Sequence, residues 1–109
     1  MDYGAGNGLL GIFARYCGFG RVALNDIDLP FLEAARKLSQ ALHIDMDAFI
    51  EGDISQVKDH PYAKQLNAIA GTDVIEHIYN LDDFFGVDSF HQPIHGFCFY
   101  HSQQSAEFF

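Results

Sequence analysis

The chain has 109 residues, 49% of them hydrophobic and 19% charged, which is the composition of one globular domain and excludes a disordered chain. Its formal net charge is -9, from 15 acidic and 6 basic side chains. Such a chain repels phosphate groups, so we expect neither nucleic acid nor a membrane as its partner.

The N-terminus has no basic segment followed by an apolar stretch, and the longest apolar runs are too short to cross a bilayer. We therefore expect a cytoplasmic protein. Its two cysteines, Cys17 and Cys98, match no metal or redox spacing, so both should be reduced thiols.

The first predicted element is a helix over residues 9–17. Apolar side chains recur there at helical spacing, at Leu9, Ile12, Phe13 and Tyr16. The glycines that follow end this pattern.

Strands and helices alternate along the rest of the chain. The predicted order is a strand over 21–25, a helix over 29–43 that Asp28 caps, a weak strand over 47–51, a loop or short helix near His60, a strand in the first half of 67–75, a helix within 79–90 and a strand over 96–101. This alternation predicts an α/β fold with a mostly parallel sheet and helices on both faces, in three α/β/α layers.

The most informative segment is the turn that contains Gly4, Gly6 and Gly8. Glycines at alternate positions let the backbone turn sharply with positive φ, and the N–H groups that open the following helix attract electronegative groups. From the glycines alone, a tight strand-to-helix turn without a ligand is an alternative. The turn could also bind a dinucleotide, because residues 6–11 fit the pattern G-x-G-x-x-G with Gly11 as the third glycine.

An acidic residue, Asp2, begins this turn. Its carboxylate would repel a pyrophosphate but suits a ligand with a cationic amino group. Asp2 and the three alternating glycines resemble the first motif of class I, Rossmann-like methyltransferases that use S-adenosylmethionine. The resemblance implies cofactor-binding residues along the methionine and ribose parts of this molecule: Asp2, Gly4, Ala5, Gly6 and Gly8.

A second acidic residue matches the same family. Asp26 lies 18 positions after Gly8, and an acid near this spacing can accept hydrogen bonds from ribose hydroxyls. Asp28 is expected to cap the next helix, which leaves Asp26 for the ligand. Asp26 and Ile27 resemble the family's acid before the second helix, so the resemblance implies that both contact the cofactor.

Gly52, Asp53 and Ile54 resemble the third motif of the family. There the acid commonly bonds the adenine amino group, and the apolar neighbour packs on the ring. Taken alone, Asp53 is better explained as an ordinary loop residue. Its position after the third predicted strand favours the cofactor role.

The segment after the fourth predicted strand resembles that of small-molecule methyltransferases related to quinone-biosynthesis enzymes. The resemblance implies that Thr72, Asp73 and Val74 lie near the methionine end of the cofactor. Glu76 and His77 would then lie at the substrate face as candidate catalytic residues. His77 is the candidate base, because histidine exchanges protons near neutral pH. Alternatively, these two residues merely begin a helix.

The resemblance implies an enzyme that transfers a methyl group from S-adenosyl-L-methionine to an oxygen, carbon or nitrogen nucleophile of a small molecule. Two alternatives stay open: a NAD(P)-dependent Rossmann oxidoreductase, and an inactive methyltransferase-like fragment that binds a partner. We expect no metal, because Pro93 disfavours a helix that would join His91 and His95 at ligand spacing.

The ends of the sheet are expected to be incomplete. A glycine-rich turn of this kind follows a buried strand, but only three residues precede this one, so most of the first strand should be missing. The family's core has seven strands, and the last two should also be absent. Residues 1–109 would then form a partial cofactor-binding core, truncated at both ends.

Overall fold

The structure is a computed structural model that describes residues 1–86, 94, 96–100 and 107–108. His91, Pro93 and His95, on which the metal argument depends, lie outside these residues, as do the ends of the predicted helix 79–90 and strand 96–101. The elements are β1 (Asp2–Tyr3), α1 (Leu9–Tyr16), β2 (Ala23–Asp26), α2 (Leu29–Ala41), β3 (Ala48–Glu51), α3 (Ile54–Asp59), the 3-10 helix η1 (Pro61–Gln65), β4 (Ala68–Thr72), the 3-10 helix η2 (Ile75–His77), α4 (Leu81–Phe85), β5 (Gly96–Tyr100) and β6 (Glu107–Phe108).

Within the described residues, six strands form one sheet in the order β3-β2-β1-β4-β5-β6. The strands β1 to β5 pair in parallel, and β6 pairs antiparallel with β5. The strand order reverses between β1 and β4, which is the place where open α/β sheets bind ligands. The mostly parallel sheet confirms the predicted Rossmann-like α/β fold.

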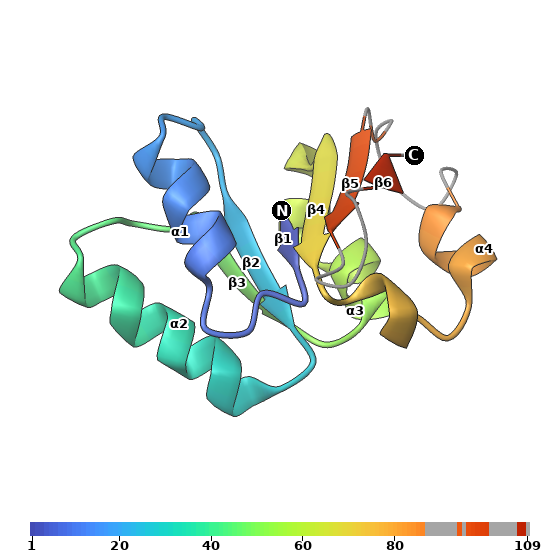
Figure 1. Cartoon of the computed structure of the whole chain (residues 1–109), viewed down its shortest axis with the longest axis horizontal. Helices are drawn as coiled ribbons and strands as arrows, with labels where there is room; N and C mark the ends of the chain where they lie inside the picture. The colour runs from blue at the N-terminus through green and yellow to red at the C-terminus, as the bar shows by residue number, and fades with distance from the viewer. Residues whose placement is uncertain (87–93, 95, 101–106, 109) are drawn as a thin grey trace.

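Helices α1 and α2 cover one face of the sheet, and α3 and α4 cover the other, which gives the predicted three layers (Figure 1). On the first face Leu24 of β2 packs with Leu32 and Ala35 of α2. On the second face Val57 of α3 and Phe84 of α4 belong to one apolar core. Each face has its own core, because successive side chains along a strand point to opposite faces.

Aromatic rings fill the second core beside β1. The Tyr3 ring meets the Phe84 ring edge to face, with centroids 4.9 Å apart, and the Phe85 and Phe97 rings meet in the same way at 5.0 Å. Such pairs stabilise a fold by about 0.5–1.5 kcal/mol beyond the burial of their area. The cluster therefore fixes Tyr3, the residue that precedes the glycine-rich turn.

Capping side chains explain where α2 and α3 begin. Asp28 accepts a hydrogen bond from the Phe31 N–H at 3.4 Å, which confirms the predicted cap of α2. The 3-10 helix η1 confirms the predicted loop or short helix near His60. Helix α3 lies before η1 and begins where Asp53 and Gln56 form a capping box, in which Gln56 Oε1 accepts from the Asp53 N–H at 2.8 Å.

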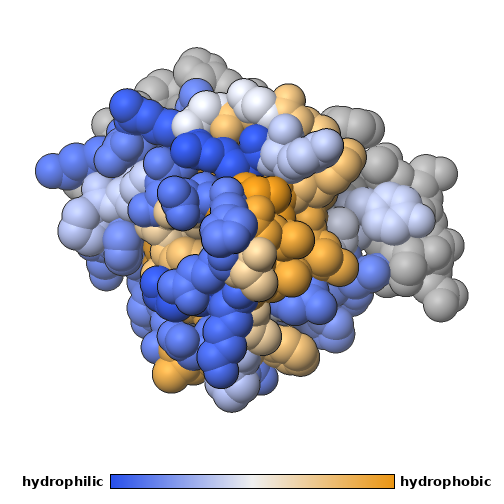
Figure 2. Space-filling model, turned by 90° about the vertical axis from the view of Figure 1, so that its left-hand side faces the viewer, coloured by the Kyte–Doolittle hydropathy of each residue, from blue (hydrophilic) through white to orange (hydrophobic). Residues whose placement is uncertain are grey.

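Helix α1 buries a narrower face than its apolar spacing suggests. Ile12 is buried, whereas Leu9, Phe13 and Tyr16 are 61%, 63% and 75% exposed. A Cβ atom on Gly11 would overlap a leucine side chain of β2. The helix therefore lies close to the sheet at Gly11, where it has no side chain. Figure 2 looks onto the side where α1 and α2 lie and shows hydrophobic side chains at the surface.

Three expectations from the sequence concern membrane-spanning helices, cysteines and metal ligands. None of the described helices combines the length and apolar character needed to traverse a lipid bilayer. Cys17 and Cys98 are free thiols. In the same part of the chain, no three potential metal ligands lie together.

Candidate functional site

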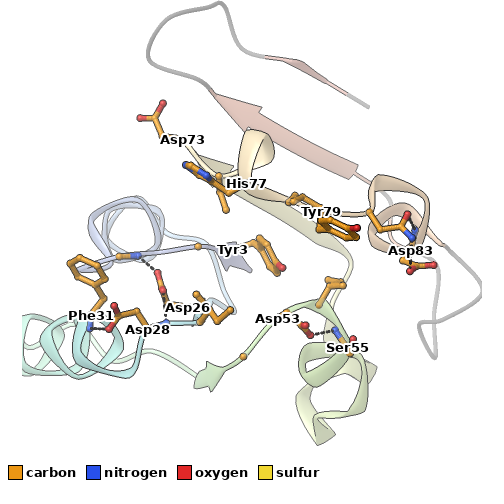
Figure 3. Close-up of a pocket in the computed structure, with 18 residues that line it drawn as sticks. Tyr3, Asp26, Asp28, Phe31, Asp53, Ser55, Asp73, His77, Tyr79 and Asp83 are labelled. Atoms are coloured by element: carbon orange, nitrogen blue, oxygen red, sulfur yellow. Dashed lines mark hydrogen bonds between the residues drawn. The ribbon is translucent and has the colours of Figure 1, made fainter.

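A cleft of about 760 Å³ lies at the carboxyl ends of β1 to β4, at the reversal of the strand order (Figure 3). Nine predicted site residues line it: Gly4, Gly6, Asp26, Ile27, Asp53, Ile54, Asp73, Val74 and His77. The other five do not belong to the lining: Asp2, Ala5, Gly8, Thr72 and Glu76. Because parallel strands end at the same edge of a sheet, the fold brings four distant motifs into one cleft.

The glycine-rich turn presents bare backbone to this cleft. Gly4 and Gly6 have φ angles of +66° and +56°, in the left-handed region that favours glycine. A Cβ atom on Gly4 would lie 2.5 Å from Cγ2 of Val74, so the loop packs directly on the segment after β4. A Cβ atom on Gly6 would meet nothing within 4 Å, so a ligand can lie against the backbone there.

Asp26 holds this turn from the end of β2. Its Oδ2 atom accepts a hydrogen bond from the Gly6 N–H at 2.7 Å, and its Oδ1 atom accepts from the Asp28 N–H at 2.8 Å. Figure 3 shows the carboxylate between the two backbone segments. Each carboxylate oxygen has a second lone pair, so Asp26 can still accept hydrogen bonds from the hydroxyls of a ligand.

Asp2 is buried, and it is not one of the cleft-lining residues. Its Oδ2 atom accepts a hydrogen bond from the Gly11 N–H at 2.9 Å, while Oδ1 has no hydrogen-bond partner among the described residues. Burial raises the pKa of this carboxyl group to about 6, against the opposing effect of the Gly11 hydrogen bond. Asp2 therefore joins β1 to the first turn of α1, and its contact with a cofactor stays a prediction.

The Gly52–Asp53 turn forms another wall of the cleft. Asp53 is exposed and caps α3, since its Oδ1 atom accepts from the Ser55 N–H at 2.8 Å. The half-buried Ile54 follows it in the cleft lining. Each carboxylate oxygen has more than one lone pair, so Asp53 can cap α3 and still accept a hydrogen bond from a ligand.

The segment after β4 forms the outer lip. Asp73 has a φ angle of +51°, and its N–H donates to the Tyr100 carbonyl at 2.7 Å. Glu76 and His77 lie in the single turn of η2, with His77 Nε2 3.6 Å from Glu76 Oε1. The His77 side chain is 77% exposed. Both residues belong to a short 3-10 turn that begins at Ile75, and their catalytic roles stay predictions.

Several lining residues lie outside the sequence prediction. Tyr3 stands inside the first motif, and its position at the end of β1 is a signal that could have identified it. Burial, together with the nearby Asp53 carboxylate, raises the pKa of its phenol. Phe31 lies in the first turn of α2, shortly after Asp26, and this position is a weaker indication of a site residue than that of Tyr3. Tyr79 is fully exposed at the lip, and nothing in the local sequence pattern predicts its place.

Carboxylates dominate the charge of the cleft. Five line it: Asp26, Asp28, Asp53, Asp73 and Asp83. No lysine or arginine is present among the described lining residues. The resulting negative potential favours ligands with a positive charge and disfavours phosphates.

Comparison with known proteins finds methyltransferases that match part of the chain. A stretch of 46 residues is 48% identical to ribosomal protein L11 methyltransferase of Burkholderia mallei (strain NCTC 10229), which covers 42% of this chain and 15% of that protein. The protein of the same name from Burkholderia vietnamiensis (strain G4 / LMG 22486) is 36% identical over 75 residues, 64% of this chain and 25% of that protein. No family model and no solved structure matches the chain.

These relatives agree with the predicted methyltransferase and correct its predicted acceptor. Their name gives a protein as the acceptor, which contradicts the expected small-molecule acceptor and the resemblance to quinone-biosynthesis enzymes. The chain spans only 15% to 25% of the length of these two relatives. Over as much as 64% of its own length, it is similar to enzymes named for methylating a ribosomal protein.

Proposed function

We propose that the cleft binds S-adenosylmethionine and that the chain forms the cofactor-binding part of a methyltransferase that acts on a protein. The observation that carries this proposal is the meeting of Gly6, Asp26 and Asp53 in one acidic cleft at the sheet's switch point. The similarity to ribosomal protein L11 methyltransferases supports the reaction class and the macromolecular acceptor. A ribosomal acceptor would place the reaction in the cytoplasm.

The cleft fits this cofactor in size and charge. Its volume of about 760 Å³ lies within the usual range for small-molecule sites. The open space at Gly6 allows a ligand to approach the backbone closely. S-adenosylmethionine carries a sulfonium and an ammonium group, and the five lining carboxylates are compatible with both positive charges.

Each wall of the cleft would bind a different part of the cofactor. The backbone of Gly4 and Gly6 would lie along the methionine and ribose parts, and Asp26 would accept from the ribose hydroxyls. Asp53 would meet the adenine amino group. Ala5, Gly8, Ile27, Ile54, Thr72, Asp73 and Val74 complete the proposed cofactor-binding set, with Asp2 acting from behind the turn.

The bound cofactor supplies a methyl group already activated by positively charged sulfur. The chain's own residues have to bind the cofactor, align it with the acceptor and exclude water. Alignment of reacting groups can lower the reaction barrier by several kcal/mol. His77 lies on the exposed lip, where it could take a proton from an incoming acceptor, and Glu76 lies close enough to orient its ring. An open lip suits an acceptor side chain presented by another protein.

A dinucleotide fits the cleft less well. Its pyrophosphate would have to lie beside the glycine-rich turn, within an acidic cleft that offers no described lysine or arginine to neutralise it. Gly11 does not decide between the two ligands, since it lies against β2 and its role is close packing.

Calorimetric titration of the chain with S-adenosylhomocysteine and with NADH tests the proposal. We expect saturable binding of S-adenosylhomocysteine and no binding of NADH. Gly20→Ala is the matched control, because Gly20 lies outside the cleft lining and a Cβ atom there meets nothing within 4 Å, so cofactor affinity should be unchanged. Binding of NADH in preference to S-adenosylhomocysteine would contradict the proposal.

A further inference from the structure

Asn25 places a buried amide group in β2, next to the buried carboxylate of Asp26. Only 1% of its surface is exposed. Its Nδ2 group donates to the Ile50 carbonyl and to the Gly52 carbonyl, both at 2.9 Å. These two bonds hold the end of β3 and the turn that follows it. Burying a polar group costs free energy unless the group is hydrogen-bonded, and these two bonds offset that cost for the Asn25 amide. An asparagine at this buried position is therefore explained by the two backbone groups that it holds.

The same stretch of β2 also holds the glycine-rich turn. The Asn25 carbonyl accepts a hydrogen bond from the Ala5 N–H at 2.7 Å. Asp26 binds the Gly6 N–H through its side chain and the Gly52 N–H through its carbonyl, at 2.7 and 2.9 Å. Two neighbouring residues therefore connect two loops that border the cleft from different strands.

The connections of Asn25 to the two loops can be separated by mutation. Its side chain holds Gly52, whereas its backbone carbonyl holds Ala5. Gly52 has a φ angle of +117°, and a Cβ atom there would come within 2.7 Å of Gln56, so the turn is confined between α3 and β2. Replacing the Asn25 side chain would remove the bond to the Gly52 carbonyl, so that the turn would stay attached to β2 only through the Gly52 N–H and the Asp26 carbonyl, and it would leave the glycine-rich turn bound.

We propose that Asn25 is a positioning residue that sets the Gly52–Asp53 turn relative to the glycine-rich turn and so makes the cleft selective for adenine. The inference rests on the proposed binding of S-adenosylmethionine, in which Asp53 meets the adenine amino group. Asn25 acts through this turn and does not itself line the cleft.

The test compares S-adenosylhomocysteine with S-inosylhomocysteine, in which an oxygen replaces the adenine amino group. Titration of the unaltered chain should show tighter binding of S-adenosylhomocysteine. In Asn25→Leu the ratio of the two affinities should fall about tenfold, because the two buried hydrogen bonds that hold the end of β3 and the Gly52 turn are lost. The matched control is Ile69→Val, a buried change in β4, which should lower stability but leave the ratio unchanged.

Each result separates this inference from the proposed function. An unaltered chain that binds neither ligand would overturn the proposed function. An affinity ratio that stays the same in Asn25→Leu, while the unaltered chain binds both ligands, would overturn the role of Asn25.

A measurement on the unaltered chain covers the case in which Asn25→Leu does not fold. The side-chain amide signals of Asn25 in a nuclear magnetic resonance spectrum should shift when S-adenosylhomocysteine is added, and shift less with S-inosylhomocysteine. Signals that respond equally to the two ligands, or to neither, would contradict the inference.

Discussion

The two sides of the cleft are built in different ways. On the side of β1 to β3, Asn25 and Asp26 hold the two turns: they accept hydrogen bonds from the glycine-rich turn and both donate to and accept from the Gly52 turn. On the side of β4 and α4, the lip presents exposed side chains, with His77 77% exposed and Tyr79 fully exposed. The first side is held by buried polar groups, whereas the second meets the solvent.

This difference matches the two ligands of a methyl transfer. A cofactor that is always the same gains affinity from loops that are already ordered, because less conformational entropy is lost on binding. An acceptor protein brings its own surface, which exposed loop side chains can meet. Mutations on the two sides should therefore affect stability and cofactor affinity very differently.

The largest effect on the ordered side is expected from Asp2, because burial raises the pKa of its carboxyl group from 3.8 to about 6. Between these values the folded state binds more protons than the unfolded state, so stability falls as the pH rises through this window. By neutral pH the loss amounts to about 3 kcal/mol. Asp2→Asn keeps an oxygen that can accept from the Gly11 N–H, and it should be more stable than the unaltered chain by up to this amount.

Urea unfolding of both proteins, from about pH 4 to about pH 8, measures this difference. Their unfolding free energies should be similar at the acidic end and diverge toward neutral pH. The two proteins share the other groups whose charges act on Asp2, namely Asp26 and the amino terminus of the chain. If the two stability curves run parallel across the range, Asp2 does not ionise with a raised pKa.

The second comparison concerns cofactor affinity on the two sides of the cleft. Asp26→Ala removes two hydrogen bonds that hold the backbone at Gly6 and Asp28, so the affinity for S-adenosylhomocysteine should fall about 100-fold. His77→Ala changes an exposed side chain of the lip and should stay within about twofold of the unaltered affinity. Calorimetry decides, and equal losses in the two variants would contradict the division between the two sides.

Much of the fold follows from local signals in the sequence. The glycine-rich turn, the Asp28 cap and the alternation of strands and helices predict the α/β order, because each depends on residues close together in the chain. The side of α1 that becomes buried is less predictable. The spacing of Leu9, Phe13 and Tyr16 predicts a helix, but close packing at Gly11 decides which strip meets the sheet.

The site divides in a similar way. Residues at or just after the ends of strands, such as Asp26 and Asp53, could be predicted to converge because parallel strands end at one edge of the sheet. Tyr79 could not, since its place depends on how the segment after η2 leaves the sheet. The linking role of Asn25 cannot be predicted from the sequence, because its partner Gly52 lies in the turn after another strand and no local pattern joins the two residues.

Gly11 offers a smaller and purely structural test of the ordered side. Gly11→Ala would gain about 1 kcal/mol of helix propensity, but the added methyl group would overlap Leu24, and overpacking of this kind typically costs about 1–3 kcal/mol. We expect a net loss of about 1 kcal/mol in the unfolding free energy. Gly20→Ala is the matched control, because a Cβ atom there meets nothing within 4 Å, and it should change stability by less than about 0.5 kcal/mol. A stable Gly11→Ala variant would mean that α1 can move away from β2 at little cost, and the ordered side would then be less rigid than its hydrogen bonds indicate.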